Sequence, residues 1–557
     1  MEFSSVDTIW VLIAAALVFF MQAGFAMVET GFTRAKNAGN IIMKNLMDFS
    51  IGTPTYWLIG FGIMFAGSGP LIGGLDFMVR GNYDSAFPTM AFLIFQTVFC
   101  ATAATIVSGA MAERTKFSAY CLYSFLISAL IYPVSGHWIW GDGWLAQLGF
   151  HDFAGSTAVH MVGGVASLVG AKIVGARIGK YSKTGESRAI PGHSLTLGAL
   201  GVFILWFAWF GFNGGSTVAM SSQDDIVSAS KIFVTTNLAA ATAAVFTMFI
   251  TWIRYKKPDV SMTLNGALAG LVAITAGCDA VSPFGSFCIG IAAAFVIVFG
   301  IEFIDKVLKV DDPVGAIGVH GLAGAAGTIL TGIFALDGGL AYGGGWAMVG
   351  VQALGVVAVF AWVAITMGII FTIIKKTIGL RVSPAEEIAG LDITEHNIES
   401  SYADFMVSST VTDFEPSGKN AGTVPSNVAV PVINNSKPGA KMTKITVITN
   451  KDKLLRLHDA LDEVGITGLT VTEVRGHGMQ KGHTEYYRGV PVKVRLLPKV
   501  QIDIVVCKIP PQTVIDTIKK TLYTGNVGDG KIFVTDVENV VKVRTGEQGY
   551  DALQDNE

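Results

Sequence analysis

Charged residues are scarce in this sequence. Asp, Glu, Lys and Arg make up 15% of its 557 residues, and 51% are hydrophobic, whereas a soluble globular protein carries about 25% charged residues. The shortage is uneven, because residues 1–400 contain 44 charged residues and residues 441–557 contain 32. This excludes a soluble globular protein for most of the chain. It indicates at least two domains, one in a membrane and one in water.

Cysteine is scarce as well. The five cysteines show no CxxC or His-paired spacing, and four lie in apolar segments, where a free thiol acts as a small hydrophobe. We therefore expect no disulfide and no structural metal, and no nucleophile or metal pattern indicates an enzyme. The net charge of −3 gives no support for nucleic-acid binding. The first residues lack the basic region of a cleaved signal peptide.

Eleven apolar runs are long enough to cross about 30 Å of hydrocarbon. They lie at residues 7–31, 41–66, 88–112, 117–137, 154–176, 193–217, 230–252, 262–280, 284–304, 313–337 and 345–374. Lys and Arg are concentrated after every second run, beginning with the first, and the alternate connections contain only Arg80 and Lys231. Because basic residues mark the cytoplasmic side, we expect a multi-pass protein of the cell (inner or plasma) membrane with its N-terminus outside and its C-terminal domain in the cytoplasm.

One pattern occurs twice in these runs. Asp152 precedes His160 by eight residues, and Asp312 precedes His320 by the same number. The first copy opens an inward run and the second an outward run, so runs one to five and six to ten form an inverted repeat, as in many transporters. Eight residues place each His about 12 Å along its helix. We expect the two histidines to meet near the middle of the membrane.

The two histidines are the strongest functional candidates, because an ionisable side chain inside a membrane is by default functional. Two neutral imidazoles in contact can pass a proton, and burial keeps such a pair mostly uncharged. The alternative for either residue is a hydrogen bond that only supports packing. For Asp152 and Asp312, capping of the free N–H groups at a helix start explains the carboxylate at least as well as attraction of a cation.

Aromatic residues gather toward the outer ends of the runs. Trp140, in a segment with two further tryptophans, is either an anchor at the membrane interface or a cation–π face for a small cation. Ser216 follows Phe212 and two glycines, and its hydroxyl can bind a cation. Phe99 either plugs a pore or only packs.

Together these motifs resemble the ammonium transporter (Amt/Rh) family. The resemblance rests on Asp152-x-Ala-Gly-x4-His160, on Gly211-Phe212-Asn213 with Ser216, and on Asp311-Asp312-Pro313-x6-His320-Gly321, and it covers roughly residues 5–405. It implies a polytopic α-helical membrane protein of 11 transmembrane helices in an inverted 5+5 repeat, assembled as a homotrimer with one pore per subunit. It also implies ammonium recruitment by Phe99, Trp140 and Ser216, a gate of Phe99 and Phe212, a proton relay of His160 and His320, and support from Asp152 and Asp312.

The composition changes after Arg381. Residues 406–441 are rich in Ser, Thr, Asn, Pro and Gly and are interpreted as a flexible linker. From residue 442 the pattern predicts an α+β domain with the ferredoxin-like order βαββαβ. The predicted strands lie near 445–448, 469–474, 502–506 and 532–537, and the predicted helices near 454–464 and 511–522.

Two glycine-rich segments, 476–489 and 524–531, stand out in this last domain. Backbone N–H groups of such turns can hold phosphates, although an ordinary turn explains each segment better when it is taken alone. Together they resemble the PII signal-transduction proteins (GlnK-like) over about residues 442–550. This implies a trimer that binds ATP or ADP between subunits, and 2-oxoglutarate with Mg-ATP.

The second resemblance also implies individual roles. The nucleotide-binding positions are Thr470, Gly478, Gln480, Lys499, Gly528, Gly530, Lys531, Lys542 and Arg544. Gln480 and Lys499 would bind 2-oxoglutarate, and Gln480 would also bind Mg²⁺ when ATP and 2-oxoglutarate are present. Arg488 would lie in a loop that blocks the cytoplasmic mouth of the pore. Val492 stands where the family has its modifiable tyrosine, which excludes uridylylation there.

The sequence therefore predicts an ammonium transporter domain (1–405), a linker (406–441) and a PII-like regulatory domain (442–557) on one chain. No cofactor is expected for transport itself. A dry pore imposes the full cost of charge burial on potassium, whereas ammonium can give up its proton and cross as ammonia. The alternative is an ammonium sensor that signals through its PII domain with little net transport.

Overall fold

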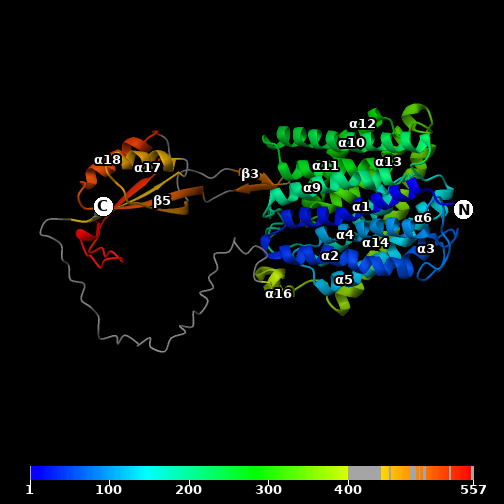
Figure 1. Ribbon diagram of the computed structural model, residues 1–557, viewed down its shortest axis with the longest axis horizontal. Coiled ribbons are helices and arrows are strands. Elements are labelled where there is room, and N and C mark those ends of the chain that lie inside the picture. Colours follow the sequence, from blue (N-terminus) through cyan, green and yellow to red (C-terminus); the bar gives the residue numbers. More distant parts are fainter. Residues whose placement is uncertain are drawn as a thin grey trace. The chain divides into compact units, whose positions relative to one another are not determined.

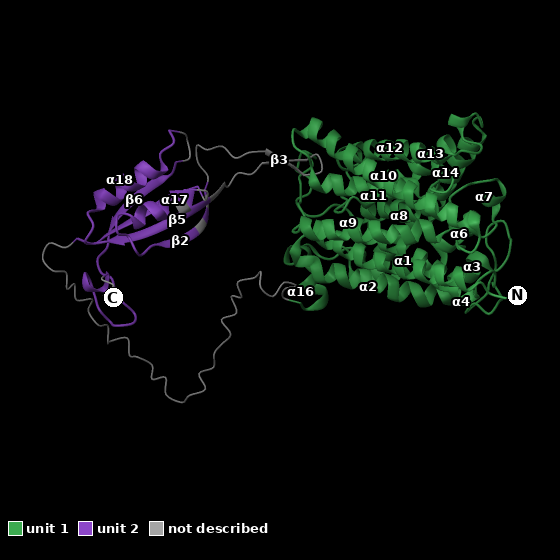
Figure 2. Cartoon of the chain, turned by 45° about the horizontal axis from the view of Figure 1, so that its top comes forward, with its two compact units in different colours: residues 1–407, 486–491 green, residues 408–485, 492–557 purple. Residues whose placement is uncertain are grey.

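The computed structural model describes residues 2–398, 441–450, 453–476, 484–487, 490–493, 497–525 and 529–553. The chain divides into two compact units (Figure 2). The first unit comprises residues 1–407 and 486–491, and the second comprises residues 408–485 and 492–557. The predicted linker falls outside the described residues except for Lys441.

Long apolar helices make up the first unit (Figure 1). Among residues 2–398, nine helical segments are long and apolar enough to cross a membrane. Four are single helices: α1 (Ser5–Phe32), α4 (Thr89–Ala110), α10 (Gln223–Tyr255) and α14 (Ala347–Thr377). The other five contain π-helical turns: α5 (Phe117–Leu126) with η3 (Ile127–Ile131), α6 (Tyr132–Trp140) and α7 (Trp144–Gln147); η4 (Ser156–Met161) with α8 (Val162–Val174); α9 (Leu195–Trp209) with η5 (Phe210–Gly214); α12 (Pro283–Glu302) with η6 (Phe303–Val307); and η7 (Ile317–Leu322) with α13 (Ala323–Phe334).

Two of the eleven predicted runs are helical but do not reach this length and apolarity. Run 41–66 corresponds to α2 (Ala38–Thr55), η2 (Tyr56–Gly60) and α3 (Phe61–Phe65). Lys44 and Asp48 lower the hydropathy of α2, and Pro54 lies inside it. Run 262–280 corresponds to α11 (Val260–Ile274), which has 15 residues and spans about 22 Å. The shorter helices of this unit are η1 (Ala35–Asn37), η8 (Leu340–Tyr342), α15 (Pro384–Ala389) and α16 (Leu391–His396).

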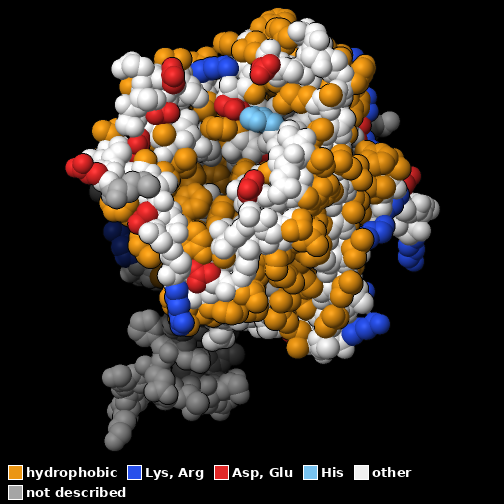
Figure 3. Space-filling model, turned by 90° about the vertical axis from the view of Figure 1, so that its right-hand side faces the viewer, with side chains coloured by type: hydrophobic (Ala, Val, Ile, Leu, Met, Phe, Trp, Pro, Cys, Tyr) orange, Lys and Arg blue, Asp and Glu red, His pale blue; other side chains and the backbone are white. Residues whose placement is uncertain are grey.

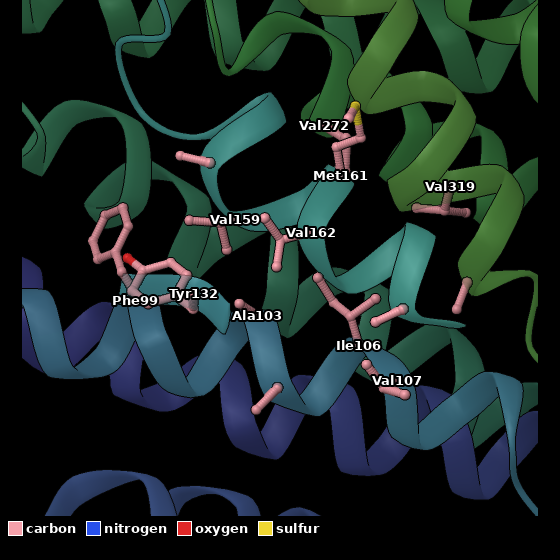
Figure 4. Packing of buried hydrophobic residues seen from close by; sticks show 14 of the residues in the cluster. Phe99, Ala103, Ile106, Val107, Tyr132, Val159, Met161, Val162, Val272 and Val319 are labelled. Atoms are coloured by element: carbon pink, nitrogen blue, oxygen red, sulfur yellow. The ribbon is translucent and has the colours of Figure 1, made fainter. Parts of the chain in front are cut away.

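The helices of the first unit run side by side around a single apolar core. α1 packs against α9 and α4, and α10 packs against both α11 and α12 (Figure 1). In the core, Phe99 and Ala103 of α4 lie near Val159 and Val162 at the η4–α8 junction (Figure 4). On the end of the unit near the N-terminus, apolar side chains are visible in a hollow, with acidic side chains around it (Figure 3).

The second unit contains a four-stranded antiparallel sheet with two helices. Its strands are β1 (Thr443–Thr449), β2 (Thr470–Gly476), β5 (Leu497–Val506) and β6 (Lys531–Asp536), in the order β2-β5-β1-β6. Ile445 of β1 pairs with Ile504 on one side and Val534 on the other. Burial alternates along β1, as expected for a sheet with one face in the core. α17 (Leu454–Asp462) and α18 (Pro511–Leu522) contribute Leu457, Leu461, Val514 and Ile518 to that core.

The predicted order of two helices and four strands in this unit is observed, with one addition. Between β2 and β5 along the chain, β3 (Thr484–Tyr487) and β4 (Val490–Lys493) form a separate two-stranded sheet, of which residues 486–487 and 490–491 belong to the first unit. β5 also begins five residues earlier than predicted. A last short helix, η10 (Asp551–Leu553), follows β6.

Candidate functional site

Asp152 and Asp312 each hold the start of a π-helical turn. The Asp152 oxygens accept four backbone N–H groups at 2.8–2.9 Å, and the Asp312 oxygens accept three at 2.8–3.1 Å. Gly155 and Gly315 have φ of +113° and +86°, a backbone conformation that favours glycine. The two copies of the repeated motif therefore adopt the same local structure, and both carboxylates act as helix caps.

His160 and His320 are in contact. Their Nδ1 atoms are 3.2 Å apart, and their rings stack with centroids 5.2 Å apart and planes at 23°. Both side chains are buried. A Cβ atom on Gly164 would lie 2.2 Å from the backbone nitrogen of Gly321, so the helices that carry the histidines cross at a distance that only glycine permits. The structure thus brings the two predicted relay residues together.

A row of contacting aromatic rings, the aromatic file, ends at His160. The edge of Trp140 meets Phe99, with centroids 6.1 Å apart. Phe99 stacks on Phe212 at 4.2 Å and 23°, and the Phe212 ring lies 5.2 Å from the His160 ring. Phe99 and Phe212 are both buried. Trp140, Phe99 and Phe212, three of the predicted recruitment and gate residues, therefore form a continuous row of rings that ends at His160.

Two polar contacts fix the outer part of the aromatic file. The indole N–H of Trp140 donates to the carbonyl oxygen of Asp152 at 2.7 Å. The Ser216 hydroxyl donates to the carbonyl oxygen of Phe212 at 2.8 Å. Both side chains remain partly exposed. The Ser216 oxygen can therefore still accept a hydrogen bond from a cation that donates one.

In the second unit, Asp529 organises the glycine-rich turn before β6. Its carboxylate accepts the backbone N–H groups of Thr524 and Gly525 and forms an ion pair of 2.8 Å with Lys453. The Lys453 ammonium, followed by the Thr524 hydrogen bonds, holds the pKa of Asp529 well below its usual value. Gly530 has φ of +122°, and a Cβ there would lie 2.5 Å from the carbonyl oxygen of Ile448. Only glycine fits this turn.

The predicted nucleotide residues are only partly described. Lys531, Arg544 and Thr470 are exposed, Lys542 is half-buried, and the Lys499 ammonium donates to the Asn450 side chain. Lys531 is exposed and directly follows the tight turn at Gly530, and a cation at such a turn fits a phosphate group. Four predicted residues lie outside the described part of the chain: Gly478, Gln480, Arg488 and Gly528. Gln480 is also the predicted Mg²⁺ ligand. Among the residues that the structure does describe, no cluster of three or more His, Cys, Asp or Glu side chains could hold a metal.

Comparison with known families decides the identity. Residues 9–402 match the sequence model of the Ammonium Transporter Family. The chain belongs to this family. Residues 442–547 match the model of nitrogen regulatory protein P-II, so the chain is an ammonium transporter family member fused to a PII domain.

Individual relatives agree with this assignment. Ammonium transporter Amt2 of Archaeoglobus fulgidus is 47% identical over 430 residues, which cover 73% of this chain and 90% of that protein. Ammonium transporter 1 member 3 of Solanum lycopersicum is 39% identical over 425 residues, with coverage of 70% and 92%. A solved structure described as "Sensor Amt Protein" has a TM-score of 0.67 and 41% identity, with coverage of 70% and 98%. The crystal structure of Candida albicans Mep2 has a TM-score of 0.64 and 29% identity, with coverage of 69% and 88%.

Several residues of this ammonium transporter chain are not among the predicted site residues. Trp209 stacks on His160 with centroids 4.9 Å apart. Three charged residues are buried within the first unit, which we call the membrane unit from here on: Glu29, Lys44 and Asp48. The last three interrupt the apolar runs 7–31 and 41–66, and a charge inside such a run is itself a signal of function. The position of Trp209 against His160 depends on the packing of two helices that are distant in sequence.

A buried ionic cluster joins the loops of the membrane unit. Arg177 forms a bidentate pair with Asp311 at 2.8 and 2.9 Å and also contacts Glu113 at 3.0 Å. Arg114 donates to the carbonyl oxygen of Asp311 at 2.8 Å. Burial raises the pKa of Asp311, but the Arg177 and Arg114 guanidiniums outweigh it and hold that pKa well below its usual value. Arg114 and Arg177 belong to the basic connections that follow runs 88–112 and 154–176, and they therefore also hold these loops together.

Proposed function

We propose that this chain transports ammonium across the cell membrane by deprotonating it in the pore and returning the proton through His160 and His320. The observation that carries the proposal is the 3.2 Å contact between the two imidazoles at the end of the aromatic file. The proposal also includes eleven membrane-spanning helices in two inverted halves and an N-terminus outside the cell. It further includes assembly as a homotrimer with one pore per subunit. These features are supported by the resemblance in sequence and by the alternation of basic connections.

Each step of transport has a residue suited to it. Trp140 and Ser216 attract the cation, which loses its water between Phe99 and Phe212. Burying a charge among these apolar rings is costly, so potassium is rejected and ammonium gives up a proton. The Nε2 atom of His160 has no hydrogen-bond partner in the described part of the chain and is the atom available to accept that proton. Neutral ammonia then passes along the pore.

We further propose that residues 442–557 form a ferredoxin-like PII domain that regulates the pore, tethered to the transporter domain (1–405) by residues 406–441. The turn that Gly530 and Asp529 build supports nucleotide binding, with Lys531, Lys542 and Arg544 facing the phosphates. Gln480 and Lys499 would hold 2-oxoglutarate, with Mg²⁺ on Gln480. Arg488 would enter the pore mouth. Because the tether joins both domains on one chain, it keeps the PII domain at an effective concentration of about millimolar at the pore.

The central test uses the purified full chain in proteoliposomes. An ammonium jump should evoke a current in the wild type, and an equal potassium jump should not. In the double variant His160→Ala/His320→Ala, both the proton-coupled current and the exclusion of potassium should be lost. If the double variant kept both properties, the proton relay would be refuted.

The sensor alternative is kept because one relative is described as "Sensor Amt Protein". Measuring ammonium flux in the full chain and in a chain that ends at residue 405 separates the two functions. A transporter with a regulatory domain should carry flux in both, and only the full chain should respond to ATP, ADP and 2-oxoglutarate. Absence of flux in both chains, with ammonium binding retained, would favour the sensor.

A further inference from the structure

A small cavity in the first unit borders His320. Its volume is about 20 Å³, which is enough for one water molecule. Phe25, Glu29, Asn265 and Val319 are among the residues that form its other walls. Because Nδ1 of His320 faces His160, Nε2 is the ring nitrogen that remains for a molecule in the cavity. A buried carboxylate and the second histidine of the pair thus border the same space.

Asn265 indicates that this space holds a polar molecule. The side chain is 1% exposed, and neither its Oδ1 nor its Nδ2 has a hydrogen-bond partner among the described residues. Burying an amide without hydrogen-bond partners is costly. A Cβ on Gly315 would lie 2.8 Å from the Asn265 Nδ2, so glycine makes room for the amide. A water in the cavity would satisfy it.

Residues that do not line the cavity hold Glu29 in place. Its Oε2 accepts the Ser108 hydroxyl at 2.6 Å, and the Ser108 carbonyl oxygen accepts the Lys44 ammonium at 3.1 Å. Lys44 also lies over the Tyr120 ring, 5.3 Å from its centroid. A carboxylate has acceptor sites for several hydrogen bonds, so Glu29 can accept one more from a water in the cavity. The nearby ammonium offsets the cost of a buried negative charge.

We propose that Glu29 is a proton-transfer residue of the inner half of the pore. The inference rests on the proposed function. When His320 has received a proton at Nδ1 from His160, its Nε2–H donates a proton to the water, and the water gives a different proton to the Glu29 carboxylate. The water is thereby restored and Glu29 becomes a neutral acid. Glu29 then protonates an ammonia molecule that takes the place of the water, which restores the carboxylate and forms ammonium. Asn265 is a positioning residue that orients the water.

The test compares four full-chain proteins in proteoliposomes by ammonium-evoked current over a range of pH: the wild type, Glu29→Gln, Glu29→Asp and Glu302→Gln. Glutamine at position 29 keeps the shape and the Ser108 hydrogen bond but cannot take up a proton. Aspartate keeps the carboxylate on a side chain that is one methylene shorter. Glu302 is a matched control, because it is also buried and is bound by Arg254 and Tyr255 but does not border the cavity. Thermal unfolding in detergent reports on the fold of each variant.

Loss of a general acid–base group typically lowers a rate by a factor of 100 or more, so Glu29→Gln should reduce the current by at least about tenfold. Glu29→Asp should restore part of the current and shift its pH profile, and Glu302→Gln should keep the wild-type current and profile. A Glu29→Gln current equal to that of the wild type would overturn the inference, as would equal losses in Glu29→Gln and Glu302→Gln. A wild type without ammonium-evoked current would instead overturn the proposed function.

Discussion

His160 and His320 face each other with their Nδ1 atoms 3.2 Å apart, although 160 residues separate them in the sequence. Each sits on a π-helical turn that begins at a capping aspartate and a glycine with positive φ. π-Helical turns are rare and often occur at functional sites. Here the wider turn and the close crossing at Gly164 together set the distance between the imidazoles.

Replacing Gly164 by alanine should therefore separate the two histidines. The added Cβ would lie 2.2 Å from the Gly321 nitrogen, and overpacking of this kind costs about 1–3 kcal/mol of stability. We expect a lower thermal unfolding midpoint and a smaller ammonium-evoked current. Gly350→Ala is the matched control, since a Cβ on that helical glycine meets nothing within 4 Å. Equal behaviour of the two variants would show that the crossing tolerates a side chain.

Trp140 offers a test of how the cation is recruited. Trp140→Leu removes both the aromatic face and the indole N–H, whereas Trp140→Phe removes only the hydrogen bond to Asp152. A cation–π contact contributes about 0.5–2 kcal/mol, so Trp140→Leu should raise the ammonium concentration for half-maximal current by about 2- to 30-fold. Trp140→Phe should have a much smaller effect. If the two variants were equally impaired, the hydrogen bond to Asp152 would be the important contact.

The repeated Asp-to-His motif was sufficient to predict the contact between the histidines, because identical spacing in two halves indicates equivalent positions. The same reasoning missed Glu29 and Lys44, since a count of apolar runs averages over single charges. It also treated runs 41–66 and 262–280 like the others, whereas α2 carries buried charges and α11 is short. Stacking of Trp209 on His160 depends on tertiary packing, which periodicity does not encode.

The ion pair between Asp311 and Arg177 makes stability depend on pH. The folded pKa of Asp311 lies well below its unfolded value, which is about 3.9. The stabilisation is therefore fully present above about pH 4 and is lost as the pH falls toward the folded pKa. Asp311→Asn leaves Arg177 and Arg114 without this charge, and breaking a buried pair costs about 3–5 kcal/mol.

Thermal unfolding of the detergent-solubilised full chain between pH 3 and pH 7 checks this prediction. Asp311→Asn should unfold at a lower temperature than the wild type at pH 7, and the difference should narrow toward pH 3. Asp337→Asn, at an exposed position in a loop, is the control and should follow the wild type. A difference that stayed constant with pH would contradict the role assigned to the Asp311 charge.

In the PII domain, Lys453 holds the predicted nucleotide turn in shape. Its ammonium contacts Asp529 at 2.8 Å and the carbonyl oxygen of Leu522 at 2.9 Å, and Asp529 in turn binds the backbone of Thr524. Loss of one such contact costs about 1 kcal/mol, so Lys453→Met should raise the ATP dissociation constant of the full chain by roughly 3- to 10-fold. Calorimetric titration measures this change. Lys441→Met is the control, because among the described residues Lys441 forms an ion pair only with Asp536, which is exposed. An unchanged ATP affinity in Lys453→Met would place the nucleotide phosphates away from this turn.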